Sequence, residues 1–248
     1  MLVEGGQPEA NLRRAGQTIR SAASKGADLV LLPEALDCGW CDRSALRLAE
    51  PLESGSSLTQ LCQHALAAGV SVCAGLTERD SGRIYNSAVL IDSEGNLLLS
   101  HRKVNELAIG RKIYSSGKAV NGICETRLGT LGVMICADAF FPEEALTRSL
   151  AEKGAQLIVS PCAWAVPPDH DQEREPYGGL WRDVYGRVAR EHGIWIAGAS
   201  NVGEIRHGDW GGHPCVGCSM VVGPDGEVRA EGPYREEEIV YASISLPK

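Results

Sequence analysis

The sequence predicts an α/β protein with four layers in the order helix, sheet, sheet, helix, built from two similar halves. The main observation is an internal repeat along the 248 residues: helix, buried strand, helix, buried strand and hairpin occur twice in this order. Within the repeat, "KGADLVLLPEA" (25–35) and "KGAQLIVSPCA" (153–163) match in register. Because a sheet with helices on one face must also bury its other face, we expect the two sheets to pack together. The halves span about 1–101 and 130–231 of a single domain that covers 1–248.

The elements of the first half follow from the spacing of apolar residues. Leu12 and Ile19 lie on one face of a predicted helix, and Pro8 is favourable in its first turn. Short and almost wholly apolar runs predict buried strands. The expected elements are a helix at 8–24, a strand at 25–35, a helix at 57–68, a strand at 68–76 and a hairpin of strands 84–91 and 97–101.

The second half repeats this order and adds one strand in front of it. The run "LGVMIC" (131–136) predicts a buried strand before the first helix of this half. A turn at Pro224-Asp225-Gly226 predicts the closing hairpin. The expected elements are then a helix at 143–153, a strand at 153–163, a helix at 179–191, a strand at 192–200 and a hairpin of strands 217–223 and 227–231.

The first half has no full counterpart of "LGVMIC". Only "MLVEGGQ" stands in front of its first helix. Either the corresponding strand is missing or residues 1–3 are its stump. We therefore expect the first strand of this half to be missing or truncated, and a natural start of the chain upstream of Met1.

The composition narrows the classes of function. Hydrophobic residues make up 44% and charged residues 23%, and the formal net charge is −8, which argues against nucleic acid or an anionic membrane as partner. The longest apolar runs are far shorter than the roughly 20 residues of a membrane helix, and no signal-peptide pattern begins the chain. Nine cysteines, an odd number scattered singly through apolar segments, are typical of reduced thiols. We expect a cytoplasmic protein.

Three chemically capable side chains stand at or just beyond the ends of predicted strands. Cys136 lies on a strand-to-helix turn with Pro142 in the first turn of the helix, where free backbone N–H groups would favour the thiolate. Lys103 follows the strand at 97–101, and Glu34 ends the apolar run at 25–35. Each has an ordinary interpretation: a buried inert thiol, a solvated lysine and a carboxylate at the rim of the sheet. Together they offer a nucleophile, a base and a cation for attack on a carbonyl or nitrile carbon.

The motifs around these residues resemble the nitrilase superfamily of carbon–nitrogen hydrolases, which use a Glu-Lys-Cys triad. The similarity covers nearly the whole chain in order, through "ADLVLLPEALDCGW", "HRKVNEL" and "GVMICADAFFPE", with looser matches in "SPCAWA", "VAREHGIWIAGASNVGE" and "VGCSMVVGPDGEV". The resemblance implies the αββα fold, with Cys136 as nucleophile, Glu34 as general base and Lys103 and the Ala137 N–H as oxyanion donors. It also implies a thioester intermediate, a small-molecule substrate, no metal or organic cofactor and a homodimer or higher homo-oligomer.

The chain departs from the family's pattern at two places near these motifs. The residue after the cysteine is often aromatic in the family and is Ala137 here. Many members carry a second glutamate several residues beyond the lysine, where this chain has Gly110. Glu106 is the only nearby candidate for that second carboxylate, and a surface carboxylate is the equally weighted alternative.

Other residues near the predicted site have less specific signals. Trp164 and Phe140 are candidates for the pocket wall, with core packing as the alternative. Cys162 occupies the position of Glu34 in the repeat and is expected to be a packed thiol. The residues His207, His213, Cys215 and Cys218 could ligate zinc, but a loop at the pocket rim is the favoured interpretation.

The leading functional prediction is a thiol hydrolase that cleaves an amide or carbamoyl carbon–nitrogen bond and releases ammonia or an amine. Nitrile hydrolysis by the same triad is the first alternative. A binding or regulatory homologue that has lost turnover is a second, and a redox or metal protein built on Cys215 and Cys218 is a third.

Overall fold

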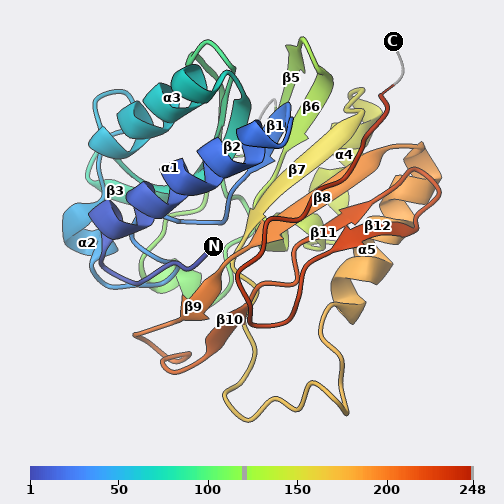
Figure 1. The fold of residues 1–248 in the computed structure, drawn as a ribbon. Coiled ribbons are helices and arrows are strands. Elements are labelled where there is room, and N and C mark those ends of the chain that lie inside the picture. Colours follow the sequence, from blue (N-terminus) through green and yellow to red (C-terminus); the bar gives the residue numbers. More distant parts are fainter. Residues whose placement is uncertain (119–121, 247–248) are drawn as a thin grey trace.

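The computed structural model describes residues 1–118 and 122–246 (Figure 1). The helices are α1 (Pro8–Ser24), α2 (Ala45–Leu48), α3 (Ser56–Ala68), α4 (Ala145–Glu152) and α5 (Gly179–His192), with short 3₁₀ helices η1 (Gly110–Lys112) and η2 (Cys136–Ala139). The strands are β1 (Leu29–Leu31), β2 (Ser71–Asp80), β3 (Arg83–Ile91), β4 (Leu97–Arg102), β5 (Ile123–Thr126), β6 (Gly129–Val133), β7 (Leu157–Cys162), β8 (Trp195–Ser200), β9 (Val202–Glu204), β10 (Pro214–Val216), β11 (Met220–Val222) and β12 (Val228–Glu231).

Each half of the repeat contributes one mixed sheet. The first sheet has the order β1-β2-β3-β4, with β1 parallel to β2 and the other neighbours antiparallel. The second has the order β12-β11-β8-β7-β6-β5, with β6, β7 and β8 parallel. The strands β1 and β7 are the counterparts that the repeat predicts. The structure adds the small β9–β10 hairpin, which the sequence pattern did not indicate.

Helices cover the outer face of each sheet, and the inner faces meet. On β3, Val89 and Ile91 pack with α1 and α3, whereas Ala88 and Leu90 point the other way into a core shared with β6, β7 and β8. This alternation is the period of two that a strand imposes on its side chains. Figure 1 shows α1 and α3 on one side of the molecule and α5 on the other. The predicted four-layer αββα sandwich is thus confirmed.

The helices agree with the sequence prediction more closely than the strands do. The observed α1 and α3 begin and end within one residue of the predicted helices. The predicted strand at 25–35 is longer than the observed β1, which covers only Leu29–Leu31. The next residue still bonds to β2, since the Leu32 N–H donates to the Cys73 carbonyl at 2.8 Å. Hydrogen bonds to β2 continue past this strand, since the Gly75 N–H donates to the Pro33 carbonyl and the Leu36 N–H donates to the Gly75 carbonyl, each at 2.9 Å.

The repeat predicts that the first strand of the N-terminal half is missing or truncated. In the described residues, no strand pairs with the outer edge of β1. Residues 1–3 lie elsewhere: Leu2 forms an isolated parallel bridge with Val202, and the Val3 N–H donates to the Val202 carbonyl at 2.9 Å. The free edge of β1 faces a groove of about 1090 Å³ whose lining includes residues 238–244 of the C-terminal segment.

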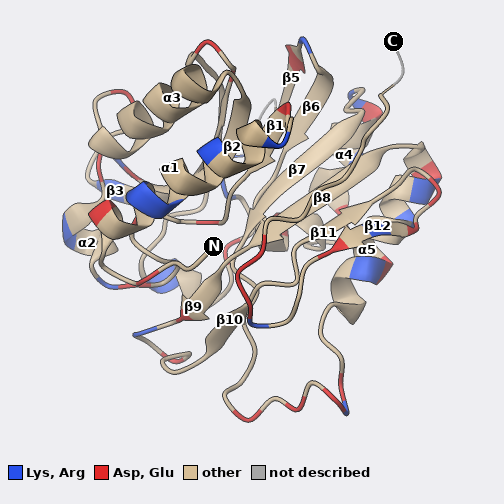
Figure 2. Ribbon diagram, viewed as in Figure 1, with Lys and Arg blue, Asp and Glu red and all other residues tan. Residues whose placement is uncertain are grey.

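Charged residues lie mainly on the outer helices and the connecting loops, with both signs intermixed (Figure 2). The central strands β7 and β8 carry none in that view. None of the helices in the described parts of the chain is long and apolar enough to cross a membrane.

The packing between the two sheets generates a prediction about stability. Leu90 is 0% exposed in the core shared by the two sheets. Replacing it with alanine should lower the free energy of unfolding by about 2–5 kcal/mol, because the substitution leaves a cavity that the surrounding side chains cannot fill completely. Urea denaturation measures this change. The control is Leu66→Ala on α3, where the side chain is 60% exposed, and a change of about 0.5 kcal/mol or less is expected. Equal effects of the two substitutions would contradict the shared core.

Candidate active site

The structure brings Glu34, Lys103 and Cys136 together beneath the surface. Glu34 lies three residues beyond β1, Lys103 directly follows β4, and Cys136 opens η2 beyond β6. Their exposed fractions are 1%, 1% and 7%. The Lys103 ammonium donates to Glu34 Oε1 at 2.6 Å. Buried charges of this kind persist only when they are paired, so the two side chains form one ionic unit.

Glu34 is held by contacts from both sheets. Its backbone N–H donates to the carbonyl of Cys162 at 3.1 Å, at the end of β7. Asn86 Nδ2 on β3 donates to Glu34 Oε1 at 2.6 Å, so this oxygen serves both the amide and Lys103. A Cβ atom at Gly75 would lie 2.5 Å from the Cα of Glu34, so only glycine allows this close approach. The second oxygen, Oε2, is buried, has no hydrogen-bond partner among the described residues and is available to a reacting group.

Lys103 stays charged in this apolar setting. Burial by itself lowers the pKa of its ammonium, but the negative charges of Glu34 and Glu106 outweigh burial and hold that pKa well above its usual range. The ammonium also lies 5.6 Å from the ring centroid of Trp40, within the range of a cation–π contact. Lys103 therefore supplies a fixed positive charge beside Cys136.

Cys136 sits on a sharp turn with an unusual backbone conformation. Its φ angle is +44°, a region that residues other than glycine rarely adopt. Its N–H donates to the Ser160 hydroxyl on β7 at 2.9 Å. The predicted helix start is wrong here: η2 follows Cys136, and α4 begins only at Ala145, after a turn that contains Pro142. The presentation of the side chain depends on this turn and not on a long helix.

Asp138 joins the turn of Cys136 to the loop that carries Lys103. Its Oδ2 accepts hydrogen bonds from the Ile135 N–H at 3.1 Å and from His101 Nε2 at 2.9 Å. Its Oδ1 accepts from the N–H groups of Val104 at 3.1 Å and Asn105 at 2.8 Å. One buried carboxylate thus fixes the turn of Cys136 and the loop of Lys103 relative to each other. In the described chain, the Ala137 N–H between Cys136 and Asp138 donates to no protein acceptor.

The thiol of Cys136 is neutral at rest. A hydrogen bond with the Cys162 side chain, burial and the charge of Glu34 raise the pKa of Cys136 well above its usual range, and only Lys103 opposes them. The expectation of a thiolate stabilised by backbone donors is therefore wrong for the free protein, because two sequence-distant neighbours outweigh those donors. The thiol needs a base before it can attack.

Glu106 lies inside the site, 4.0 Å from the Lys103 ammonium and 4% exposed. Burial raises the pKa of Glu106 to about 7, although the charge of Lys103 opposes this rise. Among the described residues, no hydrogen bond of normal geometry reaches its carboxyl oxygens, although Asn86 is close enough to lower its pKa. A Cβ atom at Gly110 would lie 2.4 Å from Glu106 Oε2. The carboxylate of Glu106 thus occupies the space into which a side chain at position 110 would project.

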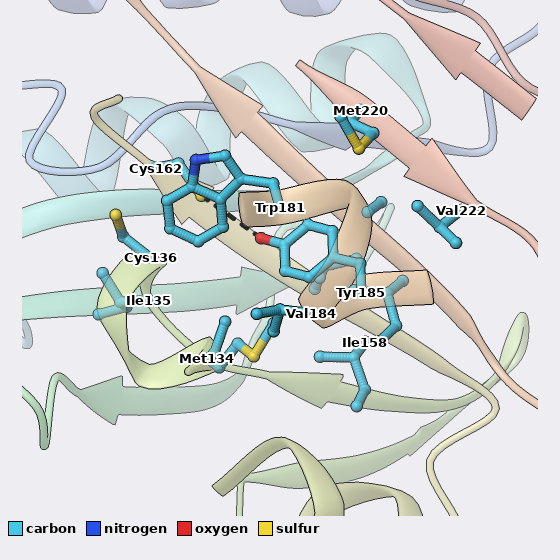
Figure 3. Close-up of a cluster of buried hydrophobic side chains, with 14 of the residues drawn as sticks. Met134, Ile135, Cys136, Ile158, Cys162, Trp181, Val184, Tyr185, Met220 and Val222 are labelled. Carbon is cyan, nitrogen blue, oxygen red and sulfur yellow. Dashed lines mark hydrogen bonds between the residues drawn. The ribbon is translucent and has the colours of Figure 1, made fainter. Parts of the chain in front are cut away.

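The two aromatic candidates belong to one cluster next to Cys136. Trp164 is 1% exposed and stacks on Trp181 of α5 at 4.7 Å between ring centroids. The half-buried Phe140 meets Trp181 edge-on at 5.5 Å. Figure 3 shows the indole of Trp181 in front of Cys162, with Cys136 beside it. Both candidates thus share Trp181 as a neighbour, and their role as a pocket wall stays a prediction.

Comparisons with known proteins agree with this geometry. Residues 5–248 match the carbon-nitrogen hydrolase family. The chain belongs to this family. It is 30% identical over 243 residues to a nitrilase of Pyrococcus abyssi, covering 97% of this chain and 85% of that protein. It is also 30% identical over 247 residues to an omega-amidase of Xenopus tropicalis, covering 95% and 83%.

The fold of this carbon–nitrogen hydrolase matches solved amidase structures of the nitrilase superfamily. One is a variant of the Nesterenkonia sp. amidase in which acrylamide has added to the active-site cysteine. The TM-score is 0.82 at 23% identity, and the match covers 98% of this chain and 90% of that one. At this identity the match supports the fold alone.

The hydrolase does not gather the four residues of the candidate zinc cluster around a common point. His207 Nδ1 pairs with Asp42 at 3.0 Å, and the ring of His213 stacks on Trp210 at 5.4 Å. Cys215 lies on β10 and Cys218 before β11. In the part of the chain that the structure describes, no three histidine, cysteine, aspartate or glutamate residues are placed to hold a metal ion.

Several residues of the hydrolase site were missed in the sequence. Asn86, His101 and Ser160 each contact a member of the triad or its turn. A weak signal existed for the first two, since Asn86 and His101 are among the few polar residues of mostly apolar predicted strands. Ser160 had none, because a small polar residue in a strand is common.

Asp138 generates a prediction about the hydrolase. Asp138→Ala should lower the free energy of unfolding by about 3–5 kcal/mol, because His101 and three backbone N–H groups lose a buried acceptor. Thermal and urea denaturation measure the loss. The matched control is Asp225→Ala, which removes an exposed carboxylate paired with Arg229 and should change little. A loss no larger than that of the control would show that Asp138 does not hold the two segments.

Proposed function

We propose that this hydrolase cleaves a linear amide or carbamoyl carbon–nitrogen bond through a thioester on Cys136. The observation that carries the proposal is the buried unit of one thiol, one carboxylate and one ammonium, with Lys103 2.6 Å from Glu34. A small-molecule substrate fits a nucleophile that is only 7% exposed. The relatives named nitrilase and omega-amidase support the same type of bond.

Glu34 is the general base of the proposed reaction. Its Oε1 is engaged by Lys103 and Asn86, but Oε2 has no partner and can accept the proton of Cys136 as the sulfur attacks the substrate carbonyl. Glu34 then gives this proton to the leaving ammonia or amine. It next takes a proton from water, which attacks the thioester, releases the acid and restores the thiol.

Lys103 and the backbone stabilise the negative oxygen of the tetrahedral intermediate. The ammonium of Lys103 is held rigidly by Glu34. It is also close enough to Cys136 for the charges of the two groups to interact. The N–H of Ala137, which follows the nucleophile in η2, supplies a second donor. Preorganised donors in a water-poor site stabilise such charge without further rearrangement.

Nitrile hydrolysis is the second candidate, and the Pyrococcus abyssi relative named nitrilase favours it. The same triad would attack the nitrile carbon and form a thioimidate. A homologue without turnover is disfavoured, because Glu34, Lys103 and Cys136 are all present and in contact range. We further propose a cytoplasmic homodimer. The exposed apolar side chains of Phe141 and Leu180, at 47% and 51%, are candidates for the subunit contact.

The nucleophile is tested by Cys136→Ala together with a panel of amides, ureas and nitriles. Ammonia release should fall by at least about 10³-fold, as expected when a member of a catalytic unit is removed. Iodoacetamide should label the wild type stoichiometrically at Cys136, and this labelling should be absent in Cys136→Ala. Cys62→Ala on α3, far along the chain and half-buried, is the control and should keep both properties. Undiminished turnover of Cys136→Ala would refute the mechanism.

The second carboxylate is tested by moving it. We propose that Glu106 positions Lys103 and the attacking water from the space that a side chain at residue 110 would use. Glu106→Ala should lower kcat more than it changes KM. The wild-type kcat/KM should rise as the pH passes about 7, where Glu106 ionises, and this step should be absent in the variant.

The double variant Glu106→Ala, Gly110→Glu should recover part of kcat, because the new side chain enters the vacated space. Glu106→Ala, Gly110→Gln is the matched control and should not recover it. Full turnover of Glu106→Gln, or equal recovery of kcat by both double variants, would show that the carboxylate of Glu106 has no role in the reaction.

A further inference from the structure

Cys162 is a second thiol placed between the catalytic residues. It ends β7, is 0% exposed, and its carbonyl accepts the backbone N–H of Glu34. Its Sγ donates to the Ser160 carbonyl at 3.2 Å and lies 3.8 Å from the Tyr185 hydroxyl, the contact drawn as a dashed line in Figure 3. The proposed reaction does not use this thiol.

The Cys162 thiol faces the nucleophile directly. Ser160 joins the two residues, because its hydroxyl accepts the Cys136 N–H at 2.9 Å and lies 3.4 Å from Cys162 Sγ. The Cys162 side chain is also close enough to Cys136 to raise the pKa of its thiol. Both belong to the same buried cluster, and Figure 3 shows both on the same side of Trp181. A second thiol near a reactive one can act as a resolving thiol, which captures the oxidised sulfur as a disulfide.

We propose that Cys136 and Cys162 form a reversible disulfide when the protein meets a peroxide, and that this bond blocks and protects the nucleophile. The proposal rests on the proposed function only in taking Cys136 as the reactive thiol. It assigns Cys162 as the resolving thiol, a role separate from hydrolysis.

The chemistry needs two steps and one oxidant. In the first, Glu34 takes the thiol proton, the sulfur of Cys136 attacks one oxygen of hydrogen peroxide, and the O–O bond breaks to leave a sulfenic acid and water. In the second, the sulfur of Cys162 attacks the sulfenic sulfur, the S–O bond breaks, and a disulfide and a second water form. A dithiol reductant then restores both thiols by exchange.

The arrangement explains why the disulfide would form quickly and why the oxidation of Cys136 would end at the disulfide. Sulfenic acids that meet no thiol are oxidised further to sulfinic acid, which is not reduced by thiols. In this site the Ser160 hydroxyl contacts both residues, and capture requires the two side chains to rotate to a bonding distance. Cys73 is a competitor, since it is buried in the same cluster and its electrostatic neighbour is Cys162.

The test treats the reduced full-length protein with a small excess of hydrogen peroxide and then with dithiothreitol. Each variant is compared with its own untreated ammonia release. The wild type should lose turnover and regain nearly all of it, at least about fivefold more than Cys162→Ser, whose nucleophile goes on to sulfinic acid. Cys162→Ala is a second replacement in case the serine variant folds poorly. Cys73→Ala is the matched control and should recover like the wild type.

Peptide mass spectrometry of unreduced samples gives a readout that does not depend on turnover. The wild type and Cys73→Ala should contain the peptide of residue 136 joined to that of residue 162, and Cys162→Ser should carry two added oxygen atoms on Cys136. Recovery of the wild type no better than that of Cys162→Ser, or a bond from Cys136 to Cys73, would overturn the proposal. Such a failure leaves the hydrolysis of amides by the untreated protein intact, whereas loss of the proposed function would appear in the untreated samples.

Discussion

The buried ion pair between Lys103 and Glu34 is the interaction on which the site depends. Two opposite charges, each about 1% exposed, would be costly to bury alone, and each is stable there because of the other. The pair keeps Lys103 charged in an apolar interior. It also engages one oxygen of Glu34, together with Asn86, and leaves the other oxygen without a partner. A fixed cation and a free base therefore arise from one contact.

The duplicated architecture brings this pair to the nucleophile. Glu34 and Cys162 occupy equivalent positions of the two halves, and the N–H of the first donates to the carbonyl of the second at 3.1 Å. The two sheets pack face to face, so the ends of β1 and β7 meet across the inner core. Asp138 then connects the turn of the nucleophile to the loop of Lys103. The site is therefore shared by both halves and needs both to be folded.

Two further side chains, Glu106 and Cys162, lie at the site beside Glu34, Lys103 and Cys136. The carboxylate of Glu106 fills the space beside Gly110, into which a side chain at that position would project. Cys162 puts a second sulfur near Cys136 and is among the groups that raise the pKa of the Cys136 thiol well above its usual range. Both features depend on side chains of the hydrolase that touch the reacting groups without belonging to the triad.

The sequence alone was sufficient for the repeat, the helices α1 and α3 and the triad candidates Glu34, Lys103 and Cys136, because apolar periodicity and the ends of buried runs are local properties. Only the tertiary structure decided the protonation of Cys136, the burial of Glu106 and the role of Ser160 as a hydrogen-bond acceptor. These depend on distances between residues far apart in the chain. Such distances are set by the packing of the two sheets, which no local pattern of residues records.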